Sequence, residues 1–146
     1  MANHELSKLE ALAKAQAYCA RSEHCAADVR RKLYEWQIPS EYADFIEQKL
    51  YEEDFLNDAR FCRAYVHDKV EYQSWGRLKI QAGLRALDLP EHEISAALDT
   101  IDEETYFSNL RHLSNQRSED SEEKRLRFLL QRGFTYDEIC KSACDH

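Results

Sequence analysis

Two stretches of the sequence resemble each other: residues 32–41 (KLYEWQIPSE) and residues 83–92 (GLRALDLPEH). Their prolines, Pro39 and Pro90, are 51 residues apart, and the apolar residues before each proline align at the same shift. A third copy, residues 128–136 (FLLQRGFTY), follows after a further 45 residues. A self-similar period of about 50 residues in a helical chain is typical of stacked supersecondary units.

The composition favours helices throughout the chain. Only three Gly and two Pro occur in 146 residues, whereas 33% of the residues are charged. Leu, Ala, Glu, Lys and Arg are good helix formers, and no segment alternates as a half-buried strand does. We therefore predict an all-α protein with nine helices, three in each repeat.

The three repeats are expected to span residues 1–54, 55–101 and 102–146 as one continuous array. A unit of about 45 residues buries little surface alone, so neighbouring units are expected to stack. Stacking of this kind predicts an elongated, curved helical array. Such a body suits a groove or a filament better than a small molecule.

Local signals place the helices within each repeat. Ser40 is expected to cap the third helix, and Asn57 or Asp58 to cap the fourth. Pro90 suits the first position of the sixth helix, and residues 135–138 (TYDE) form a capping box that opens the last one. An apolar stripe is expected to bury the first helix, and it comprises Leu9, Leu12, Ala13 and Ala17.

The five cysteines indicate reduced thiols in the cytoplasm. Their number is odd, their spacing matches no disulfide framework, and residues 1–16 lack the apolar core of a signal peptide. No apolar stretch approaches the roughly 20 residues of a membrane span. We therefore expect a monomeric cytoplasmic protein without membrane contact.

No motif in the sequence indicates catalysis or a metal centre. Cys140, Cys144 and His146 give a C-x3-C-x-H pattern without a second ligand pair at standard spacing. Glu23 and His24 are adjacent and would point apart on a helix, and no HExxH motif, nucleophile elbow or phosphate-binding loop accompanies them. We predict no enzymatic activity, no cofactor and no metal. A metal-dependent enzyme that uses the C-terminal cysteines is the most distant alternative.

The formal net charge of −8 argues against a protein that mainly coats nucleic acid. Basic residues nevertheless recur on the second helix of the first two repeats, where they could contact phosphates or carboxylates. We predict weak, salt-sensitive binding to single- and double-stranded DNA. The candidate residues for contact with a partner or nucleic acid are Arg21, His24, Arg30, Arg31, Lys32, Arg60, Arg63, Trp75, Arg77, Lys79 and Arg85.

Each of these positions has a plainer interpretation. The basic residues could form an ordinary solvated helix face, and His24 could make a structural hydrogen bond at its turn. Trp75 is either an exposed hot spot or a packing residue between the first two helices of its repeat. Arg77 and Lys79 are expected to be exposed, so their reversal would leave stability nearly unchanged. The third repeat is expected to contribute less, because acids crowd the start of its second helix: Glu119, Asp120, Glu122 and Glu123.

Four stretches resemble motifs of the RecX family. Residues 21–24 (RSEH) look like its R-x-E-H signature, and residues 56–61 (LNDARF) look like its L-N-D-E-R-F stretch. Residues 75–80 (WGRLKI) resemble its G-x-x-K-I element, and residues 132–134 (RGF) resemble its terminal R-G-F/Y. The resemblance extends from about residue 9 to about residue 143.

Two residues depart from the family pattern. Ala59 stands where Glu is usual, and Cys25 stands where a capping Ser is common, a change that costs about 1 kcal/mol. The resemblance implies a regulatory protein that binds along the groove of the RecA–single-stranded-DNA filament and modulates recombinase activity in DNA repair and the SOS response. Inhibition is the expected effect, and stimulation is the alternative that the sequence leaves open. It implies no active site.

A general helical adaptor with a non-recombinase protein partner is the competing interpretation. The net charge favours the adaptor somewhat, because filament DNA is itself acidic. The four ordered family-like stretches favour the recombinase modulator.

Overall fold

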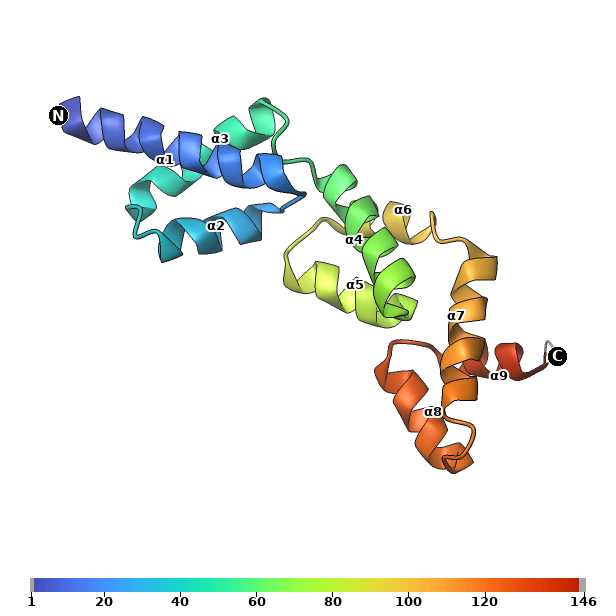
Figure 1. Ribbon diagram of the computed structural model, residues 1–146. Helices are drawn as coiled ribbons and strands as arrows, with labels where there is room; N and C mark the ends of the chain where they lie inside the picture. The colour runs from blue at the N-terminus through green and yellow to red at the C-terminus, as the bar shows by residue number, and fades with distance from the viewer. Residues whose placement is uncertain (1, 145–146) are drawn as a thin grey trace. The chain divides into compact units, whose positions relative to one another are not determined.

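The computed structural model describes residues 2–144, and all regular structure in this range is helical (Figure 1). The elements are α1 (Ala2–Arg21), α2 (Ala26–Glu35), a 3-10 helix (Ser40–Tyr42), α3 (Ala43–Glu52), α4 (Asp58–Gln73), α5 (Arg77–Ala86), α6 (Glu91–Leu98), α7 (Glu103–Gln116), α8 (Glu122–Gln131) and α9 (Tyr136–Cys144). The predicted all-α class and the nine α-helices are confirmed over these residues. Three consecutive α-helices correspond to each predicted repeat.

The chain forms two compact units, residues 1–61 and residues 62–146. The first unit contains α1 to α3, and the second contains most of α4 together with α5 to α9. The second and third repeats therefore share one unit. No helix within residues 2–144 has both the length and the apolar character needed to cross a membrane.

One hydrogen-bonding pattern ends the second helix of every repeat and explains the repeated sequence. After α2, the N–H of Ile38 donates to the carbonyl of Leu33 at 3.0 Å, while Gln37 takes a left-handed φ of 59°. This is the Schellman C-cap, in which an apolar residue after the turn packs back on the last helical turn. The same bond joins Leu89 to Leu84 and Phe134 to Leu129, at 3.3 Å in each case.

The left-handed residue differs among the three caps. Gly133 adopts a φ of 106° without a Cβ penalty, whereas Gln37 and Asp88 carry side chains at φ values of 59° and 62°. Pro39 and Pro90 follow these two caps and cannot continue the preceding helix. The first two repeats therefore end their second helix with proline, and the third ends it with glycine.

The buried face of α1 differs from the predicted stripe. Of the predicted residues only Leu12 is buried, while Leu9 is 53% exposed and Ala13 and Ala17 are also exposed. The residues buried against α2 and α3 are Ala11, Leu12, Ala15 and Cys19. Apolar residues of α1 form two overlapping rows, and packing selects the row that the sequence pattern did not favour.

Two of the four predicted helix starts are confirmed. Asn57 accepts the N–H of Arg60 at 2.9 Å and so caps α4. Thr135 and Glu138 form the predicted capping box of α9, with reciprocal bonds of 3.0 and 2.9 Å. Ser40 does not cap α3, because it begins the 3-10 helix, and the N-cap position of α3 is occupied by Tyr42. Pro90 lies one position earlier than predicted, at the N-cap of α6.

Two backbone segments touch inside the second unit. The N–H of Gly76 donates to the carbonyl of Arg132 at 2.9 Å, and the N–H of Leu78 donates to the carbonyl of Gly133 at 3.1 Å. A Cβ atom on Gly76 would lie 2.2 Å from the carbonyl carbon of Gly133. Glycine is required at position 76 because no side chain fits between these backbones. The contact fixes the start of α5 against the turn between α8 and α9.

Candidate partner interface

The basic residues of α2 pair with acids on the surface of the first unit. Arg30 contacts Asp44 and Glu47 of α3, at 2.8 Å each. Arg31 and Lys32 pair with acids of their own helix at 3.2–3.9 Å. Exposed pairs of this kind contribute about 0–1 kcal/mol, so a partner can replace the acids at small cost.

His24 belongs to the turn between α1 and α2. Its ring stacks on Tyr18 with the centroids 3.9 Å apart, and it bonds with Ser22 at 3.1 Å. Its other ring nitrogen lies 3.3 Å from Asp28, which also accepts a backbone N–H at the start of α2. His24 therefore shapes the turn before α2, and its neighbour Arg21 is exposed.

Arg60 ties together parts of the first unit that are distant in the sequence. Its guanidinium pairs with Glu23, in the turn after α1, and with Asp54 at 3.0 Å. It also donates to the carbonyl of Asp54 at 3.0 Å. Two of the family-like stretches, residues 21–24 and 56–61, meet in this contact. Arg60 is thus a positioning residue of the first unit.

Two further candidates, Arg63 and Arg85, lie on the surface of the second unit. Arg85 donates two hydrogen bonds to Glu91, and this pair raises the pKa of Arg85 and lowers the pKa of Glu91. Arg63 lies on α4 and is exposed. Both side chains are open to a partner.

Arg77 is held inside the second unit. Its guanidinium bonds with Glu103 and Glu138 at 2.9 Å each and lies 4.2 Å from the ring centre of Tyr106. Its backbone N–H donates to the Tyr106 hydroxyl at 2.9 Å, and that hydroxyl donates to Glu138 at 3.0 Å. Burial is the main cause of the raised pKa of Tyr106. The group joins α5 to α7 and α9, so it links the second repeat to the third.

The prediction that Arg77 is an ordinary exposed residue is therefore wrong. Its side chain is 28% exposed, and that of its partner Glu138 is 15% exposed. The acids that bind it lie 26 and 61 residues away, so the local sequence gave no sign of them. Lys79, predicted with it, is half-buried and has a different environment.

Lys79 belongs to a cluster around Trp75. The ammonium groups of Lys69 and Lys79 lie 4.6 and 4.4 Å from the centre of a ring of Trp75, and Tyr65 contacts that side chain edge-on. Trp75 is half-buried between α4 and α5, as its packing interpretation predicts. Arg132, in the turn after α8, donates to the carbonyl of Gln73, two residues before Trp75, at 2.6 Å. We call Lys69, Trp75, Lys79 and Arg132 the Trp75 cluster.

The three cations of the Trp75 cluster differ from the arginines described above. Among the described side chains, residues 7–144, no carboxylate forms an ion pair with Lys69, Lys79 or Arg132. Two ammonium groups on one aromatic side chain, with the Arg132 guanidinium bound to the backbone just before it, suit a phosphate or carboxylate ligand. Lys69 and Arg132 were not among the predicted candidates. Arg132 lies in a family-like stretch, which was the one available signal.

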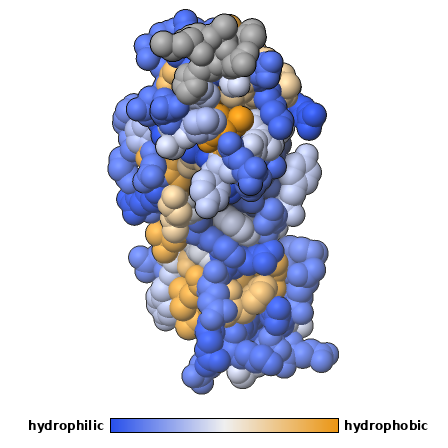
Figure 2. All heavy atoms as spheres, turned by 90° about the vertical axis from the view of Figure 1, so that its left-hand side faces the viewer, coloured by the Kyte–Doolittle hydropathy of each residue, from blue (hydrophilic) through white to orange (hydrophobic). Residues whose placement is uncertain are grey.

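The described residues offer no metal site, and one face of the molecule is largely hydrophilic (Figure 2). No three His, Cys, Asp or Glu side chains gather as a metal site in the described part of the chain. Cys140 and Cys144 are exposed free thiols, and His146 lies outside the described residues. The face in Figure 2 is largely hydrophilic, with apolar residues in small patches. A partner on this face would be recognised mainly through polar and charged contacts.

A family model described as RecX, second three-helix domain, matches residues 57–98, which comprise α4 to α6. This match confirms the resemblance to the RecX family. The matched segment contains Arg60, Arg77 and three of the four residues of the Trp75 cluster.

Two solved RecX structures share the fold. One, the crystal structure of the regulatory protein RecX, has a TM-score of 0.82 and 20% identity over 94% of this chain and 73% of its own. The other, RecX from Lactobacillus salivarius, has a TM-score of 0.77 and 22% identity over 98% of this chain and 96% of its own. The RecX fold thus extends over nearly the whole chain.

Proposed function

We propose that the protein is a RecX-type regulator that binds the RecA–single-stranded-DNA filament and inhibits recombinase activity in recombination, DNA repair and the SOS response. The match of residues 57–98 to the second three-helix domain of RecX carries the proposal. One of the solved relatives is itself called a regulatory protein. In this proposal the protein acts in the cytoplasm, as a monomer, by binding rather than by catalysis.

The ion pairs of the candidate residues divide them into two groups, those that position other elements and those that can contact a partner. An ammonium group without a partner can bind phosphate or carboxylate at once, whereas Arg77 would first have to release Glu103 and Glu138. We therefore assign positioning roles to His24, Arg60 and Arg77. Trp75 packs between α4 and α5 and positions Lys69 and Lys79. Contact roles are assigned to Arg21, Arg30, Arg31, Lys32, Arg63, Lys69, Lys79, Arg85 and Arg132.

Reconstituted filaments test this function. The protein is titrated into RecA filaments on single-stranded DNA while ATP hydrolysis and strand exchange are followed. We expect both rates to fall at protein concentrations stoichiometric with RecA or lower. The double variant Lys69→Gln/Lys79→Gln should inhibit less, and the matched surface variant Lys124→Gln/Arg127→Gln should inhibit as the wild type does.

A helical adaptor with another protein partner is the second candidate. The net charge of −8 and the pairing of most arginines with acids favour it, because neither suits an acidic filament. Unchanged hydrolysis and strand exchange at stoichiometric protein, together with no cosedimentation with filaments, would favour the adaptor.

A further inference from the structure

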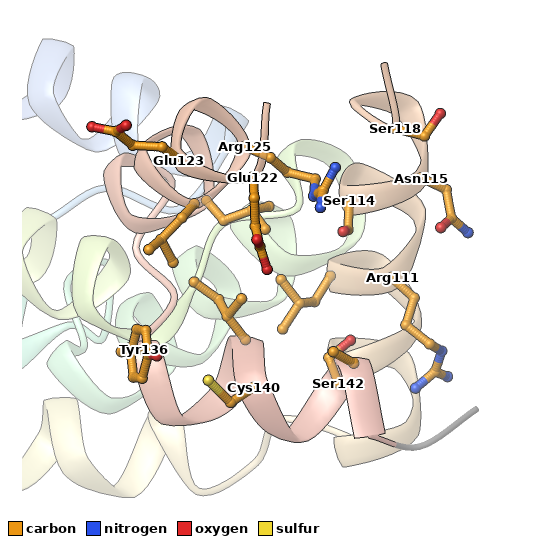
Figure 3. Close-up of a pocket in the computed structure, with 15 residues that line it drawn as sticks. Arg111, Ser114, Asn115, Ser118, Glu122, Glu123, Arg125, Tyr136, Cys140 and Ser142 are labelled. Carbon is orange, nitrogen blue, oxygen red and sulfur yellow. The ribbon is translucent and has the colours of Figure 1, made fainter. Parts of the chain in front are cut away.

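The third repeat contains an open pocket that the proposed function does not use. Helices α7, α8 and α9 surround it, and its volume is about 690 Å³ (Figure 3). Ligand pockets commonly have volumes of about 300–1,000 Å³, so this one could accept several side chains of a peptide. Each helix contributes residues spaced three or four apart, which is the spacing of one helix face.

One side of the pocket is apolar. Leu110 and Leu129 are buried at its base, and Leu126 and Ile139 are half-buried along its wall. Ala143 is exposed at the end of α9, so the wall is open to solvent there. Burial of such a wall by an apolar ligand is favourable by about 25 cal/mol for each Å² covered.

The other side of the pocket is polar and carries two arginines. Arg125 points from α8 toward Ser114 of α7, and Arg111 comes from α7 itself (Figure 3). Arg125 donates only a long bond of 3.4 Å to a backbone carbonyl, and neither arginine forms an ion pair with a described residue. Ser114, Asn115 and Ser118 supply further hydrogen-bonding groups.

Two acids at the rim reduce this positive charge only in part. Glu123 also lines the pocket, and it is paired at 3.5 Å with Arg127, which lies outside the lining. Glu122 lies in the first turn of α8, where a carboxylate is stabilised by the helix dipole. Of the two acids that line the pocket, Glu122 forms no ion pair with a described residue. The two arginines therefore outnumber the lining carboxylates that are not neutralised.

We propose that this pocket binds a short acidic and apolar peptide segment of a protein partner. Leucine-like side chains would cover Leu126 and Ile139, and carboxylates beside them would pair with Arg111 and Arg125. A guanidinium binds a carboxylate through two parallel hydrogen bonds, which gives orientation as well as affinity. The proposal goes beyond the proposed function, because it requires neither a recombinase nor DNA.

Labelled peptides provide the direct test. Fluorescein-labelled ELLELLE is titrated with the full chain, and its fluorescence anisotropy is compared with that of QLLQLLQ and KLLKLLK. We expect the acidic peptide to bind about tenfold more tightly than the glutamine peptide, as two charge-assisted hydrogen-bonded contacts allow. The lysine peptide should bind most weakly.

Variants locate the binding to the pocket. Arg111→Gln/Arg125→Gln should remove the preference for the acidic peptide, and Ala143→Glu, at an exposed position, should abolish binding while the circular-dichroism spectrum stays unchanged. Lys124→Gln, on the same helix but outside the pocket, should bind as the wild type does. Equal binding of the three peptides, unchanged binding by Ala143→Glu, or concentration-dependent dimerisation that Ala143→Glu abolishes would overturn the proposal. These readouts contain no RecA, so their outcome is independent of the filament assays.

Discussion

The second helices of the first two repeats, α2 and α5, carry similar basic residues but use them differently. On α2, Arg30, Arg31 and Lys32 pair with acids on the surface of the unit. On α5, Arg77 is held by acids from the third repeat, while Lys79 lies on Trp75 and forms no ion pair with a described carboxylate. Similar basic residues therefore form surface ion pairs on α2. On α5, one of them links two repeats and the other remains available to a partner.

The difference lies in where the acids are. The α2 arginines find carboxylates on their own helix or on the neighbouring α3, within 17 residues of the sequence. Arg77 finds Glu103 and Glu138 only because the second and third repeats pack within one unit. A basic helix face is thus a candidate interface only after the packing of its repeat is known.

The largest effect is expected from Gly76→Ala, which tests the link between the second and third repeats. The added methyl would meet the backbone of Gly133, which cannot move without breaking the bonds at 2.9 and 3.1 Å. We expect a loss of about 3 kcal/mol in the free energy of unfolding, measured by urea denaturation. Gly83→Ala is the matched control, since its methyl meets the hydroxyl end of the Tyr65 side chain. Equal losses for the two variants would show that the link is not rigid.

Arg77→Met and Arg30→Met compare the two helices directly. Without Arg77, the mostly buried carboxylate of Glu138 loses its charged partner, so we expect a loss of about 2 kcal/mol. Arg30→Met should cost less than about 1 kcal/mol, because its two acids are accessible to solvent. Urea midpoints at neutral pH measure both variants. Equal costs would remove the distinction between a structural and a surface arginine.

Lys69→Gln/Lys79→Gln should affect binding rather than folding. Loss of the cation–π contacts costs about 1 kcal/mol. Each lost phosphate contact should reduce the salt slope of single-stranded DNA binding by about 0.7. Fluorescence of Trp75 in a Trp36→Phe background reports on the cluster. Loss of folding in the double variant, or an unaltered salt slope, would contradict a contact role.

The smallest effect concerns acid stability in the first unit. Hydrogen bonds from Asn57 and then Arg60 hold the pKa of Asp54 below its ordinary value. A carboxyl with a lowered folded pKa contributes stability above its unfolded pKa of about 4, and this contribution is lost as the pH falls through the folded pKa. Asp54→Asn should therefore flatten the decline of stability below about pH 4. Urea midpoints at neutral pH and at acid pH check this, and a slope as steep as that of the wild type would assign the decline to other carboxyls.

The parts of the fold that the sequence predicts are those with a local cause. Three copies of one helix-ending pattern appear in the sequence because each Schellman turn needs an apolar residue five positions after the helical carbonyl that it closes on. The capping residues Asn57 and Thr135 bond to a backbone N–H three residues later, so the local sequence was enough to predict them. The buried row of α1 could not be predicted in this way. Alanine and leucine occur in both rows, and packing against α2 and α3 decides which row is buried.

The candidate site was less predictable for the same reason. Arg77 and Lys79 look equivalent in the sequence, and their environments depend on residues from another repeat. The Trp75 cluster joins α4, α5 and the turn after α8, so no local window contains it. The only hint that these residues belong together is that Trp75, Lys79 and Arg132 lie within two of the family-like stretches.

The number of residues between contacting side chains also determines which unit can fold first during synthesis. In the first unit, the long-range side-chain contacts of Gln16 with Glu53 and of Glu23 with Arg60 each span 37 residues. In the second unit, Gln73 pairs with Arg132 and Arg77 with Glu138, over 59 and 61 residues. Contacts that are more distant in sequence form more slowly, and domains fold from the N-terminus as the ribosome adds about 5–20 residues per second. The first unit can therefore complete its core while the third repeat is still being translated, whereas Arg77 and the Trp75 cluster must wait for the last helices to leave the ribosome.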